Sequence, residues 1–258
     1  MSERDVAFDV ADGVATVEFR RPEALNAVTT GMKAETTDRV RAYGDDPDVR
    51  AIRLRGAGGD FCAGGDITEV PESDYSLSEF TEGWADLFDA LRTCGVPTVA
   101  QVEGVCLGGG FDLMLHCDFA VAAEDATLGQ PESNLGIVNH FAPPLLREMV
   151  GWRRAMELVM TGDPVDGAAA AEMGLVTRSV PADDLDSEVE TLLDSLTAKS
   201  PRVLRRLKRG MYESLDMPPD AAQDHLGRIA HEAVRTDPDY REGIDAQLEG
   251  RDPEWDPE

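Results

Sequence analysis

Apolar and polar residues alternate along the first twenty positions of the chain and then give way to helical spacing. The alternation runs through "VAFDVADGVATVEF" on both sides of Asp12-Gly13, a dipeptide that favours a tight turn between antiparallel strands. This pattern predicts a hairpin with strands near residues 5–11 and 14–19. From residue 29 to 43 the apolar spacing is that of a helix, and the following "VRAIRLRGAG" predicts a further strand.

The middle of the chain repeats this succession of strand and helix. A helical pattern over residues 76–93 is followed by the apolar, β-rich run "VPTVAQVEGVC", and then by "FDLMLHCDFAVAAEDATLGQPE", which predicts a helix, a strand and a turn. Because strands followed by a helix recur, we predict an α/β fold built from several short sheets or one coiled sheet. We assign residues 1–200 to this core.

After about Ser200 the pattern is helical, with Pro and Gly breaks, and no stretch is typical of a strand. The apolar positions here are too few for an independent core. We therefore expect residues 201–258 to form a helical region that packs on the core, on a neighbouring subunit, or on both. Self-association of the protein follows as an expectation.

The charge of the chain is its most unusual property, since 51 acidic residues against 24 basic ones give a formal net charge of −27. A nucleic-acid partner would need a basic patch to overcome the repulsion of its phosphates, and the sequence shows none, which argues against such a partner. The carboxylates are spread along the chain, and only three of the 24 basic residues are lysines. Such a surface is tolerable where salt shortens the screening length to a few ångströms, so we infer a halophile's cytosolic protein; an ordinary acidic protein is the alternative.

The remaining composition predicts a cytoplasmic protein. The four cysteines show no CxxC spacing and lie mostly in apolar or small-residue settings, which indicates buried thiols in a reducing compartment. The N-terminus has no basic stretch followed by an apolar one, and no run approaches the roughly 18 apolar residues of a membrane helix. We expect no membrane partner, no metal site and no disulfide framework.

Two glycine-rich turns are candidate ligand-binding sites: "RGAGGDFCAGGDI" from Arg55 and "GVCLGGGFDL" from Gly104. Glycine lets a backbone approach a ligand closely, and free N–H groups at such turns bind anionic oxygen. Two such donors directed at one oxygen would form an oxyanion hole. The spacing fits neither a dinucleotide fingerprint nor a P-loop, and a glycine triplet on its own is more often only a tight turn.

The candidate acids and bases are Asp112, Asp118, Glu132 and His140. Each carboxylate alone fits a capping or solvated role, whereas two that face one pocket could divide acid and base work if their pKa values differ. His140 lies in the turn-like "NHFAPP", and the apolar surroundings of His116 indicate a buried residue. The chain has no GxSxG or HExxH motif, which leaves little support for a hydrolase or a metalloenzyme.

With these residues in their order, the chain resembles the enoyl-CoA hydratase/isomerase (crotonase) family. The matching segments are "RRPEALNAVTTGM", "GAGGDFCAGGDI", "GVCLGGGFDLMLHCDFAVAAEDATLGQPESNLGI", "LVMTGDPVDGAAAAEMGLV", "AKSP" and "EGIDAQLEGRDPEW", and together they cover almost the whole chain. The resemblance implies a spiral core of repeated ββα units and a helical C-terminal trimerisation region. It also implies an acyl-CoA thioester substrate, no separate cofactor, and a homotrimer or a hexamer formed as a dimer of trimers.

The resemblance further implies roles for individual residues. The backbone N–H groups of Gly65 and Gly109 would form the oxyanion hole that stabilises a thioester enolate. Glu132 and Asp112 match the two carboxylates that position water for addition across the C2–C3 double bond in the family's hydratases. The expected substrate-binding residues are Ala24, Ala27, Ala63, Gly65, Asp66, Ile67, Thr68, Gly109 and His140.

Two departures from the family pattern bear on the reaction. Asp112 stands where the family's hydratases have glutamate, and the missing methylene moves the carboxylate oxygens by more than an ångström, a displacement that can change a rate about 100-fold. The loop after Glu132 reads "VNHFAPPLLREMVG", which is expected to bring Asn139, His140 and Phe141 near the acyl pocket.

Three functions therefore remain open. The first is hydration by Glu132 and Asp112 together, and the second is an isomerase or another crotonase-type lyase in which Glu132 alone transfers the proton. The third, from a different class, is a non-catalytic CoA-binding protein. Arg21 and the basic "RRLKRG" could contact CoA phosphates, although a solvated helix face suits most of these side chains better.

Overall fold

The structure is a computed structural model and describes residues 5–69 and 77–256. Within them, one sheet has the strand order β1-β2-β3-β4-β6-β9 and the other the order β5-β7-β8. The strands are β1 Val6–Ala11, β2 Val14–Phe19, β3 Ala51–Gly56, β4 Thr98–Val102, β5 Val105–Leu107, β6 Phe119–Ala123, β7 Thr127–Gly129, β8 Val165–Asp166 and β9 Arg178–Val180. Neighbours in the larger sheet are parallel except β1, which pairs antiparallel with β2.

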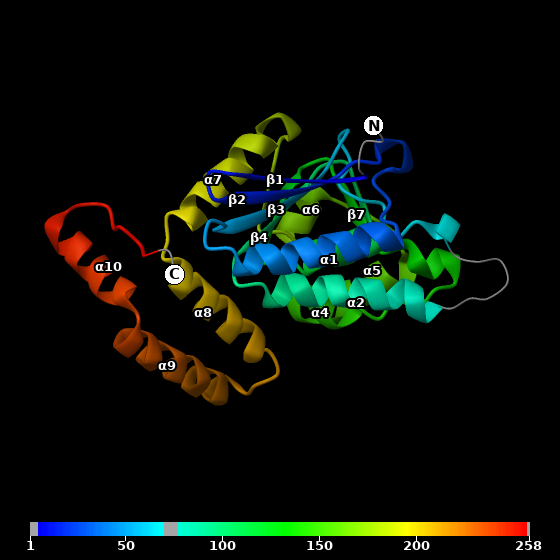
Figure 1. Cartoon of the computed structure of the whole chain (residues 1–258). Helices are drawn as coiled ribbons and strands as arrows, with labels where there is room; N and C mark the ends of the chain where they lie inside the picture. The colour runs from blue at the N-terminus through cyan, green and yellow to red at the C-terminus, as the bar shows by residue number, and fades with distance from the viewer. Residues whose placement is uncertain (1–4, 70–76, 257–258) are drawn as a thin grey trace.

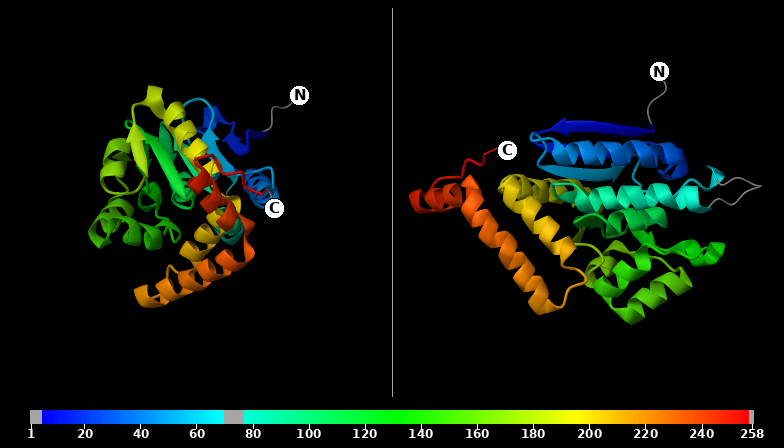
Figure 2. Two further views of the ribbon diagram at one scale, coloured as in Figure 1. Left: turned by 90° about the vertical axis from the view of Figure 1, so that its left-hand side faces the viewer. Right: turned by 60° about the horizontal axis from the view of Figure 1, so that its bottom comes forward.

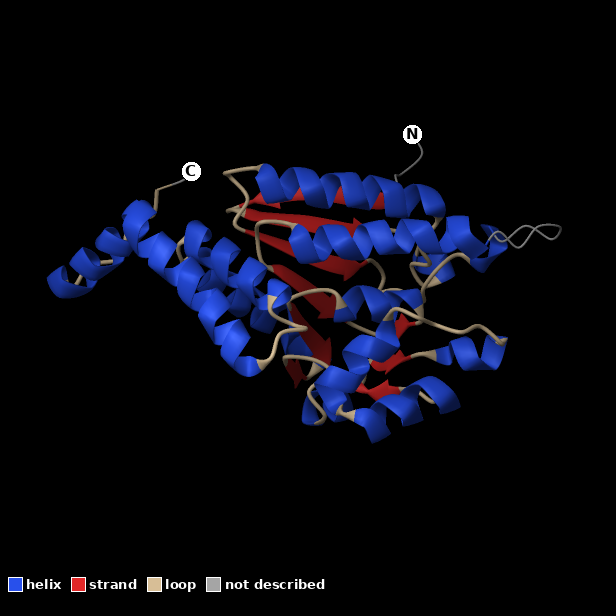
Figure 3. Ribbon diagram, turned by 90° about the horizontal axis from the view of Figure 1, so that it is seen from below, coloured by secondary structure: helices blue, strands red, loops and turns tan. Residues whose placement is uncertain are grey.

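The helices flank the sheets, as Figures 1 and 3 show. They are α1 Thr30–Asp45, α2 Leu77–Thr93, α3 Gly109–Leu115, α4 Ala142–Val150, α5 Trp152–Thr161, α6 Gly167–Glu172, α7 Leu185–Thr197, α8 Pro201–Glu213, α9 Pro219–Thr236 and α10 Pro238–Glu249. Helices α1 and α2 lie side by side on one side of the larger sheet, whereas α7 contacts β3, β4 and β6 from the other side. The larger sheet is thus a central layer covered on both faces.

The N-terminal hairpin forms as the alternation predicts. Asp12 has φ +50° and Gly13 has φ +79°, and a two-residue turn of the type whose twist matches paired strands requires positive φ at both positions. The register pairs Ala11 with Val14, and every second residue of β2 from Ala15 to Phe19 is fully buried. The period-two pattern therefore points the apolar face of the hairpin into the core.

The core is a spiral in which each turn supplies a strand to each layer and then a helix. After β4 the chain turns at Gly104, forms β5 in the second sheet and enters α3; β6 and β7 repeat the two-strand step. Earlier turns extend the second layer by single parallel bridges, Val28 to Gly65 and Cys62 to Cys106. The predicted succession of ββα units is therefore confirmed.

The core also contains a charged side chain. Lys33 on α1 is fully buried, and its Nζ lies 5.3 Å from the ring centroid of Trp84 on α2. Burial lowers the pKa of Lys33, while the charge of Glu69 opposes that shift. A cation over the aromatic face keeps part of the stabilisation that the ammonium loses on leaving water.

The C-terminal region is helical, as predicted. Helices α8, α9 and α10 extend to one side of the core in Figures 1 and 2, and α8 contacts both α9 and α2. Several large apolar side chains of this region remain exposed, namely Val203, Leu207, Met211, Leu215, Val234, Tyr240, Ile244 and Leu248. Among the described residues, no helix has the length and apolar character needed to cross a membrane.

Candidate active site

Two backbone turns meet at the start of α3. In the parallel bridge, the Val28 N–H donates to Gly64 O (2.8 Å) and the Asp66 N–H donates to Val28 O (3.0 Å), so the N–H of Gly65 points away from residue 28. Gly109 is the first residue of α3, and its N–H has no carbonyl four residues earlier within the helix. No acceptor for either N–H occurs within residues 5–69 and 77–256, so both remain available to a ligand oxygen.

A side chain added at any glycine of the triplet, Gly108 to Gly110, would meet a different neighbour. Gly108 has φ +56°, and a Cβ added there would lie 3.2 Å from Glu132 Oε1. A Cβ on Gly109 would lie 2.6 Å from the Trp84 ring, and one on Gly110 would lie 2.2 Å from a backbone oxygen. A methyl group at any of the three positions would displace its neighbours, so the triplet is required by packing around the site as well as by the turn.

Asp112 lies on the first turn of α3 and is only 2 % exposed. Its Oδ1 accepts from Gln130 Nε2 (3.0 Å), and its Oδ2 accepts from Asn139 Nδ2 (2.8 Å). Asn139 Nδ2 also donates to Gln130 Oε1 (2.7 Å), which closes a ring of three side chains. Sequence reasoning placed Asn139 near the pocket but missed this ring, and it missed Gln130 although the residue stands inside the "GQPE" motif.

Glu132 lies in the short 3-10 helix Pro131–Leu135 that follows β7. It is half-buried, and its Oε1 accepts from Asn139 Nδ2 (3.2 Å). The other oxygen, Oε2, is buried and has no hydrogen-bond partner among the described residues. Since a buried carboxylate oxygen without a partner is costly, Oε2 is an acceptor ready for a bound molecule.

Burial shifts both carboxyl groups towards the protonated form. It raises the pKa of Asp112 to about 7; the charge of Glu132 adds to the increase, and the hydrogen bonds from Asn139 and Gln130 oppose it. Burial also raises the pKa of Glu132, again against a hydrogen bond from Asn139. Burial therefore favours the protonated form of both groups, and for Asp112 the change of charge falls near neutral pH.

The three alanines predicted to bind substrate lie on two adjacent loops. The Ala27 N–H donates to Ala24 O (3.0 Å), and the Ala63 N–H donates to Leu25 O (2.9 Å). Asn26, which is fully buried, fixes both loops: its Oδ1 accepts from the Arg21 N–H, and its Nδ2 donates to the backbone oxygens of Ala57 and Asp60. Apart from its place in "LNA", nothing in the sequence indicates this role of Asn26.

Asp66 organises the loop that follows Gly65. Its Oδ2 lies 2.8 Å from Arg21 Nη1, and its Oδ1 accepts from the Thr68 hydroxyl (2.6 Å) and backbone N–H (3.0 Å). These hydrogen bonds lower the pKa of Asp66, and the one from the Thr68 side chain has the largest effect. Arg21 Nη1 is thus engaged within the fold, whereas Ile67 is 66 % exposed and presents an apolar side chain.

Asp118 does not join the other acid and base candidates, and it has a structural role instead. Its Oδ2 accepts from the Thr98 N–H (2.8 Å) and lies 2.8 Å from Lys208 Nζ, while Tyr212 donates to Oδ1 (3.0 Å). Lys208 also donates to two backbone oxygens beside the end of α2. Most of "RRLKRG" was expected on a solvated helix face; for Lys208 this was wrong, because its buried ammonium joins α8 to the core.

The histidines differ in their surroundings. His116 is buried and stacks on Phe88 (4.1 Å between ring centroids), and burial lowers its pKa to about 4, so the ring is neutral at neutral pH. Its predicted burial is confirmed. His140 is exposed, with its ring 4.0 Å from that of Phe141, and within the described chain no hydrogen bond joins it to Asp112 or Glu132.

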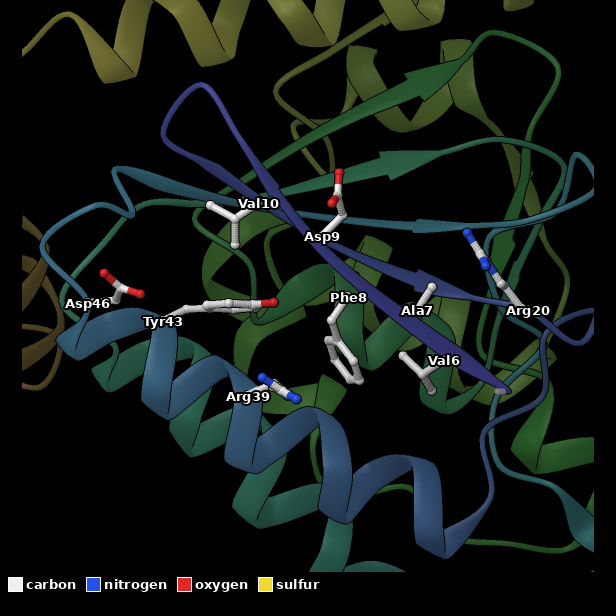
Figure 4. A pocket seen from close by; sticks show the side chains of 9 residues that line it. All are labelled: Val6, Ala7, Phe8, Asp9, Val10, Arg20, Arg39, Tyr43 and Asp46. Carbon is white, nitrogen blue, oxygen red and sulfur yellow. The ribbon is translucent and has the colours of Figure 1, made fainter. Parts of the chain in front are cut away.

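A separate groove of about 590 Å³ lies between β1 and α1, with Val6, Ala7, Phe8, Asp9, Val10, Arg20, Arg39, Tyr43 and Asp46 along it. Figure 4 shows Arg39 close to Phe8, and its guanidinium lies 5.3 Å from the centroid of the Phe8 ring. None of these residues belongs to the glycine turns or the carboxylate network. The groove is therefore distinct from the candidate active site.

Comparisons with known proteins identify the family. The family model for enoyl-CoA hydratase/isomerase matches residues 9–258. A probable enoyl-CoA hydratase of Mycobacterium tuberculosis is 35 % identical over 246 residues, which cover 94 % of each chain. A hydroxycinnamoyl-CoA hydratase-lyase of Pseudomonas fluorescens is 34 % identical over 86 % of this chain and 83 % of its own.

Solved structures agree with the sequence comparisons. The crystal structure of an enoyl-CoA hydratase from Mycobacterium smegmatis superposes with a TM-score of 0.91 and 31 % identity, over 98 % of this chain and 99 % of that one. The protein belongs to the enoyl-CoA hydratase/isomerase family. The family and the crotonase-like fold predicted from the sequence are both confirmed.

Proposed function

We propose that the protein is an enoyl-CoA hydratase that adds water across the C2–C3 double bond of a 2-enoyl-CoA thioester. The observation that carries this proposal is the pair of carboxylates, Asp112 and Glu132, joined by one amide. Beside them lie the N–H groups of two glycines that have no acceptor in the described part of the chain. Relatives named as enoyl-CoA hydratases support it.

The backbone N–H groups of Gly65 and Gly109 would hold the thioester oxygen. As a hydroxyl group bonds to C3, negative charge develops on that oxygen, and fixed donors stabilise the enolate without reorganisation. Loss of one such donor typically costs about 3 kcal/mol of transition-state stabilisation. The proposed contacts along the rest of the substrate are Ala24, Ala27, Ala63, Asp66, Ile67, Thr68 and His140.

The carboxylates would share the acid and base work. Glu132, whose Oε2 has no partner among the described residues, removes a proton from water as the oxygen attacks C3, and the same carboxyl group then returns that proton to C2 of the enolate. Asp112 has both oxygens occupied by amide N–H groups, so it contributes through the pair's shared charge and proton rather than by its own contact with C2 or C3.

An assay of crotonyl-CoA hydration in high salt tests the proposal, with the loss of the enoyl thioester absorbance as its readout. Turnover should be measurable with the folded protein. Absence of turnover with a panel of 2-enoyl-CoA thioesters would refute hydration, and tight acyl-CoA binding without turnover would favour a non-catalytic CoA-binding protein.

A second candidate is an isomerase or another crotonase-type lyase in which Glu132 alone carries the proton. The burial of Asp112 and the occupation of both its oxygens favour it. Comparison of Asp112→Asn with Glu132→Gln separates the two reactions, because a one-base isomerase should tolerate the first substitution and not the second.

For assembly, we propose a homotrimer or a hexamer in which α8 to α10 carry the contacts between subunits. The support is the row of exposed apolar side chains on these helices, which include Leu207, Met211 and Leu248. Light scattering coupled to size exclusion gives the subunit number. The acidic composition likewise supports a cytoplasmic protein of a halophile.

A further inference from the structure

The orientation of the Asn139 side chain is set by the backbone of the next helix. Its Oδ1 accepts from the backbone N–H groups of Phe141 (2.8 Å) and Ala142 (3.2 Å) at the start of α4. Since a backbone N–H can only donate, Oδ1 must face α4, and the amide nitrogen must face the other way. The start of α4 thus directs the two N–H donors of Asn139 into the site.

That nitrogen lies between the two carboxylates. Asn139 Nδ2 is 2.8 Å from Asp112 Oδ2, 3.2 Å from Glu132 Oε1 and 2.7 Å from Gln130 Oε1. Within residues 5–69 and 77–256, it is the side-chain donor that contacts both carboxylates. Gln130 is fixed in turn, because its Nε2 donates to Gly108 O (3.3 Å) and to Asp112.

We propose that Asn139 is the positioning residue of this site: it connects the buried Asp112 to Glu132 and holds Glu132 Oε1, so that Oε2 is left to exchange protons with the substrate. This inference rests on the proposed function, since it assigns proton exchange to Glu132. The amide reaches from the loop to the carboxylate of Asp112, which is buried.

The electrostatics support the same role. Two carboxylates close to each other repel, and N–H donors placed between them favour the ionised forms of both. Accordingly, the hydrogen bond from Asn139 opposes the increase in pKa that burial causes in Asp112 and Glu132. The titratable groups that the amide contacts are Asp112 on α3 and Glu132 on its 3-10 helix. His140 is its neighbour in the chain, and His116 follows α3 and contacts the backbone oxygen of Asp112.

The test must separate this bridge from the capping of α4. Asn139→Ser keeps an oxygen that can accept from the α4 N–H groups but removes the Nδ2 donors, and Asn139→Asp keeps the shape while it replaces the donor with an acceptor. Pro144→Ala changes the exposed first turn of α4 without altering the amide and serves as the matched control.

We expect both Asn139 variants to lower kcat on crotonyl-CoA by about tenfold to 100-fold, with KM changed less than about threefold. In Asn139→Ser the acid limb of the pH profile should move to higher pH, because the carboxylates lose a donor that favours ionisation. Pro144→Ala should keep the wild-type kcat and profile. A wild-type kcat and pH profile in Asn139→Ser would overturn the inference.

A readout independent of turnover keeps the two proposals distinguishable. In carboxyl carbon NMR titrations, assigned with Glu132→Gln and Asp112→Asn, the pKa of Glu132 should be higher in Asn139→Ser than in the wild type. An unchanged Glu132 titration would contradict the bridge whether or not the protein hydrates enoyl-CoA. Wild-type inactivity combined with a shifted titration would instead reject the proposed function and retain the contact.

Discussion

A methyl group on Gly64 would lie 3.0 Å from the backbone nitrogen of Gly109, so the lack of a side chain at Gly64 allows the two glycine turns to lie this close. Gly64 also has φ +106°, a backbone conformation that residues with a side chain rarely adopt. We expect Gly64→Ala to displace the proposed oxyanion donors and to lower kcat by about 100-fold to 1,000-fold. Steady-state kinetics on crotonyl-CoA measure the effect.

Gly151 provides a control for Gly64→Ala, because a side chain there would strain the backbone without contacting any neighbour. It has φ +77°, and a Cβ there meets nothing within 4 Å. Gly151→Ala should therefore reduce stability through the backbone, by about 1–3 kcal/mol, and leave kcat of the folded protein unchanged. Equal kinetic losses in the two variants would mean that strain, and not the position of the donors, limits the reaction.

Removal of the Glu132 carboxylate should abolish most of the chemistry and spare binding. Glu132→Gln keeps the shape of the side chain but not its basicity, and loss of a general acid-base group typically lowers kcat about 100-fold to 10,000-fold. Calorimetry with a saturated acyl-CoA should show binding within a few-fold of the wild type. A variant that retains most of its turnover would exclude Glu132 as the proton carrier.

The raised pKa of Asp112 predicts a specific dependence of stability on pH. Because burial raises this pKa from the ordinary 3.8 to about 7, the folded protein retains a proton that the unfolded chain releases between these values. This group therefore lowers the free energy of unfolding as pH rises from about 4 to about 7, by up to about 4 kcal/mol in total.

Urea unfolding of the wild type and Asp112→Asn, at matched protein concentration, measures this dependence. The free energy of unfolding of Asp112→Asn minus that of the wild type should increase as pH rises through this range. Parallel pH curves for the two proteins would show that Asp112 is ionised throughout and that burial does not control its proton.

The contact between α8 and the core should depend on Lys208. Its Nζ lies 2.8 Å from Asp118 Oδ2, and its side chain is only 7 % exposed. Lys208→Met leaves a carboxylate without its cation and should cost about 3–5 kcal/mol of stability. The double variant with Asp118→Asn should cost less than the sum of the single variants. A lower kcat in folded Asp118→Asn would return Asp118 to the catalytic candidates.

The net charge of −27 predicts that salt stabilises the protein. Raising KCl from about 0.1 M to about 1 M shortens the screening length from about 10 Å to about 3 Å, so self-repulsion should weaken and Tm should rise. Sucrose strengthens burial by exclusion without screening and is the matched control. An equal rise of Tm in KCl and in sucrose would contradict an electrostatic origin of the stabilisation by salt.

The elements that local pattern controls were predictable from the sequence. The Asp12-Gly13 turn, α1, and the strand-helix repeat follow from periodicity and turn chemistry, which act between near neighbours. The roles of Gly65 and Gly109 as oxyanion donors, implied by the family resemblance, stay a prediction. The reason for three glycines in a row did not, because the obstacles around them come from Trp84 and Glu132, far away in the sequence.

Where the role of a residue depends on distant partners, the sequence did not predict that role, even for Asn139, which was expected near the pocket. Asn139 and Gln130 are ordinary polar residues in a loop, and only the fold brings them to Asp112. The candidate Asp118 and the basic Lys208 each suggested an exposed or reactive role alone, whereas together they form a buried contact. Sequence pattern shows which residue types are available, while the tertiary structure decides which of them meet.

The burial of lysine leaves a surface with almost no primary amines. Of the three lysines, Lys33 is fully buried, Lys208 is enclosed against the core, and Lys199 at the junction of α7 and α8 is exposed. Guanidinium groups, which bind carboxylates through a planar fork, carry nearly all the remaining positive charge. An amine-reactive fluorophore would therefore have one accessible lysine, located where the core gives way to the C-terminal helices.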